Sequence, residues 1–182
     1  MGKDWNLGFS EKEKLSTKLM REFEFDENLL KNHVEEIRSE LATSNLFRYG
    51  YSQSHKLEDR ILLKLPDFES KFIERYLRDQ PDGFAGNLDP TSQRDIVSLF
   101  VHYVQFTCYN KAELQEILTY RDKTKYGYKG VEVMTGNDSR CQKCSKIRST
   151  KYSWKELDKV PKIPFFPSCI CWYSPIIEQR DF

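Results

Sequence analysis

The chain of 182 residues carries a formal net charge of +1 and is 38% hydrophobic and 14% aromatic. This length suits one domain, or one domain with a small appendage, and the apolar content excludes a chain that is disordered throughout. The near-neutral charge excludes a general attraction to nucleic acids or membranes, and no apolar run approaches the roughly 20 residues of a membrane-spanning helix.

The first half of the chain has the residue spacing of amphipathic helices. In the segment 9–25, Ser10 and Glu13 have the spacing of a capping box, and apolar residues follow at intervals of four, which predicts a helix. Two further helices are predicted over 26–41 and 66–79, each with apolar residues on one side. The short apolar run "LEDRILLKL" between them cannot be assigned from its periodicity alone.

The most apolar segment, residues 89–109, is predicted to be the central helix, with Asp89 as its N-cap. Asn110 begins a second capping pattern, so a separate helix is predicted from there to about Tyr120. Together these segments predict a helical bundle over residues 1–125.

The pattern changes after residue 125, where two glycines interrupt the helical periodicity. Residues 131–135 alternate like a short strand, 148–154 resemble a second strand, and 155–164 are expected to form a return loop. The second unit, residues 126–182, is therefore predicted to be a small β-hairpin module. The predicted fold class is mainly α, and α+β overall.

Four of the five cysteines lie in this second unit, in two close pairs: Cys141, Cys144, Cys169 and Cys171. The N-terminus lacks the layout of a secretion signal, so the chain is expected to be cytosolic, where closely spaced cysteines more often bind metal than form disulfides. Four thiolates suit a structural zinc ion, which would also supply folding energy to a small polar module. A disulfide or redox pair and free buried thiols are the alternatives.

The stretch from residue 131 to 175 resembles the C-terminal motif of the phage head morphogenesis family, the Mu F-like minor head proteins. The matching positions are Asp138, Arg140, Cys141, Cys144, Pro167, Cys169 and Cys171. Phe166 and Ile170 stand where the family has histidine and arginine. The resemblance implies a non-enzymatic accessory protein of a phage or prophage. It would act in the virion or the bacterial cytoplasm and dock to a protein partner of a head or portal assembly. Asp138 and Arg140 would support the turn that presents the first cysteine pair.

A second hypothesis comes from the charge distribution, because residues 1–120 are acidic on balance and 121–162 are basic. Tyr152 and Trp154 are interspersed among the basic residues between 140 and 162, as in surfaces that hold phosphates and unstacked bases. The alternative function is therefore a zinc-containing regulator that binds nucleic acid. Its candidate contacts are Lys143, Lys146, Arg148, Lys151, Tyr152, Trp154 and Lys155. The simpler interpretation is a solvated basic face whose aromatic side chains pack beneath the metal site.

The remaining residues that can carry chemistry show no pattern of a catalytic site. His33, His55 and His102 have no partner at a metal-binding helical spacing, and Cys108 is expected to be a small core residue. No catalytic residue is predicted, and a non-enzymatic role is favoured.

Overall fold

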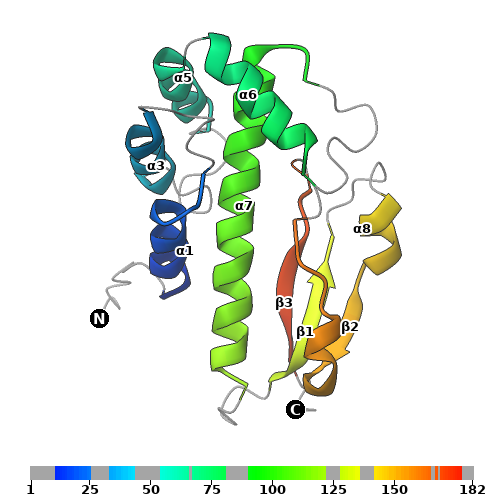
Figure 1. The fold of residues 1–182 in the computed structure, drawn as a ribbon. Helices are drawn as coiled ribbons and strands as arrows, with labels where there is room; N and C mark the ends of the chain where they lie inside the picture. The colour runs from blue at the N-terminus through cyan, green and yellow to red at the C-terminus, as the bar shows by residue number, and fades with distance from the viewer. Residues whose placement is uncertain are drawn as a thin grey trace, which may run out of the picture.

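The computed structural model of the protein describes residues 11–25, 33–43, 54–65, 67–80, 90–121, 128–135, 142–164, 167 and 169–177. These residues form a mainly helical structure with a three-stranded antiparallel sheet, which confirms the predicted fold class. Figure 1 shows the long helix α7 (Gln93–Thr119) in the middle, with shorter helices on one side and the sheet on another. Both parts of the molecule therefore pack against α7.

Among the described residues, four shorter helices precede α7: α1 (Glu11–Arg21), α3 (Val34–Thr43), α5 (Ser54–Lys64) and α6 (Asp67–Arg78). The helices predicted in the segments 9–25, 26–41 and 66–79 are thus confirmed where the structure describes them. The unassigned run is helical as well, because Leu57, Ile61 and Leu65 lie four residues apart and are all buried.

The helices enclose one hydrophobic core, to which α7 contributes the largest buried side chain, that of Phe100. The Phe100 ring centre lies 5.6 Å from that of Phe25 and 6.4 Å from that of Tyr76, with the rings tilted or edge-on. Such aromatic geometry adds to the free energy gained by burial alone. Cys108 lies in the same core and is 1% exposed, which confirms its predicted structural role.

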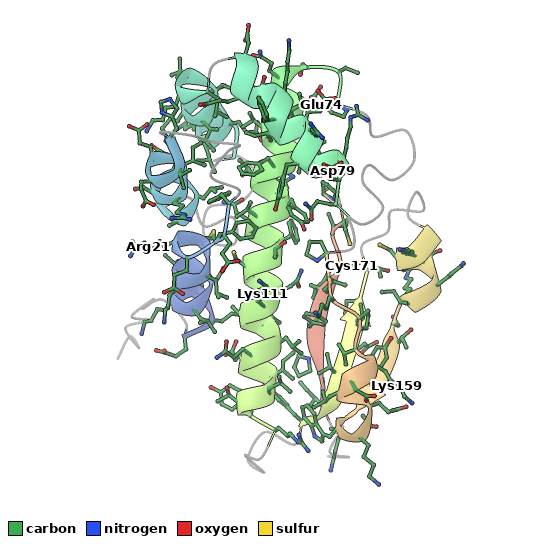
Figure 2. All side chains as sticks on the ribbon, in the orientation of Figure 1. Arg21, Glu74, Asp79, Lys111, Lys159 and Cys171 are labelled. Carbon is green, nitrogen blue, oxygen red and sulfur yellow. The ribbon has the colours of Figure 1, made fainter. Side chains whose placement is uncertain are left out.

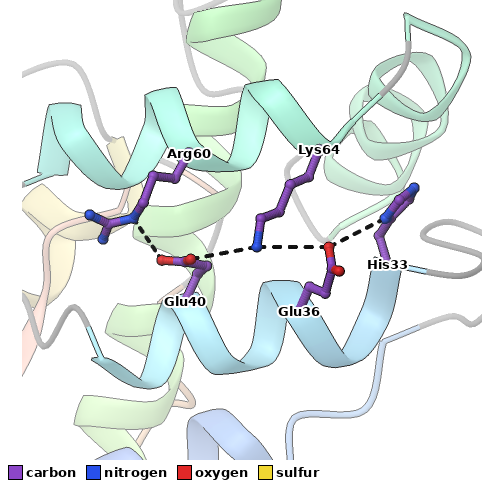
Figure 3. Close-up of polar contacts among 5 residues, drawn as sticks. All are labelled: His33, Glu36, Glu40, Arg60 and Lys64. Atoms are coloured by element: carbon purple, nitrogen blue, oxygen red, sulfur yellow. Dashed lines mark hydrogen bonds and ion pairs between the residues drawn. The ribbon is translucent and has the colours of Figure 1, made fainter.

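A chain of charged side chains connects α3 with α5 across their exposed sides (Figure 3). Arg60 Nε lies 2.7 Å from Glu40 Oε2, and Lys64 Nζ lies 3.6 Å from Glu40 and 3.7 Å from Glu36. His33 Nδ1 is 3.5 Å from the same Glu36 carboxylate. Because these side chains are partly exposed, each pair contributes little to the free energy of folding. The network instead favours one relative position of the two helices.

The N-cap of α7 is Ser92, not Asp89 as predicted. The Ser92 hydroxyl accepts from the Asp95 amide, and the Asp95 carboxylate accepts from the Ser92 amide, so the two residues form a capping box. Hydrogen bonds from the Ser92 and Thr91 side chains lower the pKa of Asp95. The predicted new helix at Asn110 is also wrong, because α7 continues without a break to Thr119. Residues of α7 beyond Asn110 are buried against the sheet, and this burial keeps the helix continuous where the local sequence suggests a new start.

The sheet has the strand order β2-β1-β3, with β1 (Tyr128–Met134) in the centre. The strand predicted at 131–135 is thus confirmed. The strand predicted at 148–154 is shorter, since β2 is Thr150–Ser153 and the 3-10 helix η4 (Trp154–Lys159) follows it. A short helix, α8 (Gln142–Ile147), lies between β1 and β2, and β3 is Trp172–Ile177. Both outer strands pair antiparallel with β1, so the unit is larger than a hairpin.

A second hydrophobic core lies beneath the sheet, and it is built around Val131, Val133 and Tyr173. Ile117 is buried in this core although it belongs to α7, so α7 supplies residues to both cores. The second unit is therefore supported by a helix of the first. The division of the chain near residue 125 stays a prediction, which the unfolding of core variants can test.

Gly130 of β1 lies opposite Ser153 of β2. A Cβ atom at this position would overlap the Tyr152 carbonyl oxygen and lie 3.1 Å from Ser153 Cα, both of which are backbone atoms. Backbone cannot move aside as a flexible side chain can. We therefore expect Gly130→Ala to separate β2 from β1 and to lower the free energy of unfolding by at least about 1–3 kcal/mol. Hydrogen exchange of the β2 amides measures this. Lys151→Ala, an exposed change on β2, is the control, and unchanged protection in Gly130→Ala contradicts the expectation.

Candidate metal centre

Three of the predicted ligands, Cys144, Cys169 and Cys171, meet at one end of the sheet. Cys144 lies in α8, whereas Cys169 and Cys171 lie just before β3, and all three side chains are buried. Figure 2 shows Cys171 at the start of β3, beside α7. Cys144 was expected in a turn after a strand, and it lies instead on a short helix. Segments 25 and 27 residues apart in the chain thus bring their thiols together.

The sulfur atoms have nearly the spacing of metal ligands. Cys144 Sγ lies 3.7 Å from Cys169 Sγ and 3.1 Å from Cys171 Sγ, and all three lie within 4.8 Å of one another. Zn–S bonds of about 2.3 Å in a tetrahedron place two sulfurs about 3.8 Å apart. The first distance matches this value, and the second would have to widen by roughly 0.7 Å. The cluster can therefore hold a metal ion with a small adjustment at Cys171.

These cysteines are free thiols, because both measured Sγ–Sγ separations greatly exceed the roughly 2.05 Å of a disulfide bond. The hydrogen bond with the Cys169 thiol and then burial raise the pKa of Cys171 above its ordinary value. Three crowded, buried thiols resist ionisation unless a cation compensates their charge. The cluster therefore has the sulfur donors of a soft-metal site, and a bound cation would stabilise the ionised form of its thiols.

Two groups of contacts hold the segment that carries Cys169 and Cys171. Asn110 of α7 donates from Nδ2 to the Cys171 carbonyl oxygen at 3.0 Å. Beyond the cysteines, the Tyr173 hydroxyl donates to the Pro161 carbonyl at 2.7 Å and accepts from the Ile163 amide at 3.3 Å. Burial raises the pKa of Tyr173 to about 12, so its phenol stays protonated and keeps donating. Two sets of hydrogen bonds thus fix the segment around Cys171: one from Asn110 of α7, and one between Tyr173 and the backbone of Pro161 and Ile163.

The other predicted members of the site are not described by the structure. Cys141, Asp138 and Arg140 lie outside the described residues, as does Phe166. The fourth ligand and the two turn-supporting residues therefore stay predictions. Asn110 is the contact that sequence reasoning missed. Its position in a capping pattern hid its role, although an asparagine inside a strongly apolar helical segment was a signal of a specific partner.

Cys108, His33 and His102 lie apart from this cluster. Among the described residues, no other group of three side chains can jointly hold a metal ion. Burial raises the pKa of Cys108 to about 12, so this thiol is not an ionised nucleophile at neutral pH. His33 approaches Glu36, and His102 lies in α7 with partners of its own. The side chain of His55 is outside the described part.

The basic residues of the alternative hypothesis are exposed, whereas its aromatic residues are engaged. The exposed set is Lys143, Lys146, Arg148, Lys151 and Lys155. Tyr152 and Trp154 are half-buried against the second core. Trp154 Nε1 donates to the Tyr128 carbonyl at 3.1 Å, and the Arg121 guanidinium lies 5.9 Å from the Trp154 ring centre. The aromatic rings thus contribute to packing, and nucleic-acid binding stays a prediction that rests on the lysines and arginine.

No helix in the described ranges combines the length and hydrophobicity that a membrane span requires. The geometry that defines the site is three buried thiols, joined to α7 through Asn110. Comparison with known protein families, curated proteins and solved structures finds no significant match to this chain.

Proposed function

We propose that this protein is a non-enzymatic docking protein whose C-terminal sheet is stabilised by one zinc ion. The observation that carries the proposal is the convergence of three buried thiols from α8 and the start of β3. Cys141, in C-x2-C spacing with Cys144, would supply the fourth thiolate. Asp138 and Arg140 would support the turn that presents it.

Zinc is favoured because thiolates are soft ligands that bind it well, and because zinc with four thiolate ligands is tetrahedral. Four protein ligands leave no position for water on the ion, so such a centre serves structure rather than catalysis. The ion would supply folding energy to a sheet whose three strands have only a small core of their own.

The test is a metal analysis of the full chain, purified without an affinity tag under reducing conditions. About one zinc ion per chain is expected, and cobalt in its place should give the intense bands of a tetrahedral thiolate complex. Cys108→Ala should bind the same amount, because that thiol lies in the other core. Folded wild-type protein that contains no metal and takes up none would contradict the proposal.

The docking partner is proposed to be a protein of a phage head or portal assembly, on the strength of the resemblance to the minor head proteins. Apolar side chains that stay exposed along this segment support a docking role: Ile170 and Trp172, next to the cysteines, are each 37% exposed, and Ile177, at the other end of β3, is 62% exposed. Co-expression with the portal or head protein encoded beside its gene tests this. A complex that survives size-exclusion chromatography is expected, and the absence of such a complex or of such a neighbouring gene contradicts it.

A further inference from the structure

Asn110 is a buried amide in the middle of a long helix. It is 0% exposed and lies inside α7, where its backbone already takes part in the helical hydrogen bonds. Buried polar side chains are retained in proteins when they satisfy a specific partner. Cys108 and Ala112, two residues to either side on the same helix, are also buried, so α7 is covered on more than one side at this point. The amide therefore requires an explanation that helix formation does not provide.

The partner of Asn110 is the backbone of a predicted metal ligand 61 residues further along the chain. Because a carbonyl oxygen can only accept, the amide is oriented with Nδ2 toward Cys171, and the 3.0 Å bond is buried. Asn110 Oδ1 is also buried and makes no hydrogen bond within the described part of the chain. The side chain is thus committed to one contact, with the residue that closes the thiol cluster.

We infer that Asn110 is a positioning residue of the metal centre, and this inference rests on the proposed zinc function. The Cys171 carbonyl is fixed by Asn110, and the Cys171 thiol lies 3.1 Å from Cys144 Sγ. The direction of a side chain follows from its backbone. The hydrogen bond from α7 therefore holds the Cys171 sulfur toward the other two thiols before the ion binds.

The same contact couples the ion to the docking of β3 on α7. When the ion leaves, the Cys171 sulfur loses one of its two constraints, and the backbone that Asn110 contacts can move more easily. A moved carbonyl would leave a buried amide without its acceptor, which weakens the contact between helix and sheet. By thermodynamic linkage, the bound ion strengthens this hydrogen bond by the same free energy by which the hydrogen bond strengthens metal binding.

The experiment compares cobalt and zinc affinity in Asn110→Leu and in the wild-type full chain, by competition with a chromophoric chelator. Leucine has a similar size but cannot donate, so we expect an affinity about 10–100-fold lower, the range found for residues that orient metal ligands. The thiolate-to-cobalt bands should also shift, because the Cys171 sulfur would no longer be held in one direction. Cys108→Ala, a buried change two residues away on α7, controls for general destabilisation.

The outcomes separate the two proposals. If the wild type binds no metal, the proposed function fails. If the wild type binds one ion while Asn110→Leu keeps the affinity and spectrum of Cys108→Ala, the zinc function stands and the positioning role is wrong. If Asn110→Leu does not fold, Asn110→Ala takes its place, because that change only truncates the side chain. Its metal affinity and spectrum are then compared with those of Cys108→Ala, and the same criterion decides the positioning role.

Discussion

Replacing Cys171 by serine is expected to abolish tight metal binding and to unfold the sheet while the helical core stays folded. Cys171 is 0% exposed and closes the thiol cluster, so a serine there would remove a thiolate and bury a hydroxyl among the remaining sulfurs. The loss of metal affinity should exceed the roughly 10–100-fold that removal of an orienting residue costs. Because the second core contains Cys144, Cys169 and Cys171 themselves, the sheet would lose its packing together with the ion.

Two signals distinguish the two parts of the molecule in this experiment. Far-UV circular dichroism follows the helices. Tryptophan fluorescence follows the sheet through Trp154 and Trp172, in a background where Trp5, outside the described residues, is replaced by phenylalanine. Cys171→Ser should change the fluorescence and keep most of the helical signal. Cys108→Ala should bind metal normally, with only the small loss of stability of a minor core truncation. A Cys171→Ser protein with wild-type metal content and fluorescence would exclude Cys171 as a ligand.

Phe100→Ala is expected to destabilise both parts of the protein, by about 3–5 kcal/mol in the free energy of unfolding. Phe100 is 1% exposed and contacts the rings of Phe25 and Tyr76, so its truncation leaves a large cavity in the helical core. The sheet should be lost in the same transition, because its core requires Ile117 of α7 and its metal segment requires Asn110. The effect is thus asymmetric: loss of the ion should unfold the sheet alone, and loss of the helical core should unfold everything.

Urea denaturation followed by the same two signals checks this expectation. In Phe100→Ala the circular dichroism and fluorescence midpoints should fall together. Leu63→Ala, an exposed change on α5, should leave both midpoints nearly unchanged. If the fluorescence midpoint of Phe100→Ala stays at its wild-type value while the helical midpoint falls, the sheet is an independent folding unit. The division near residue 125 would then be correct.

The errors in the sequence-based prediction have a common physical origin. Asp89 was preferred as the cap of the central helix because it precedes a proline, but Ser92 and Asp95 satisfy each other's backbone amides and start the helix later. Asn110 has the local pattern of a cap, yet its side chain donates to the Cys171 carbonyl and accepts no hydrogen bond from its own helix. Local patterns indicate which hydrogen bonds a residue can make. A competing partner distant in the chain decides which one it does make.

From the sequence alone follow the helices with apolar residues four apart, the central helix within the segment 89–109, the strand near 131–135 and the grouping of cysteines in the last quarter of the chain. These follow from periodicity and composition, which are local properties. Only the folded protein shows that α7 continues through Asn110, that Cys144 lies on a helix, and that three thiols meet beside α7. These depend on contacts between segments tens of residues apart, where the burial of a few side chains outweighs the local preference of the chain.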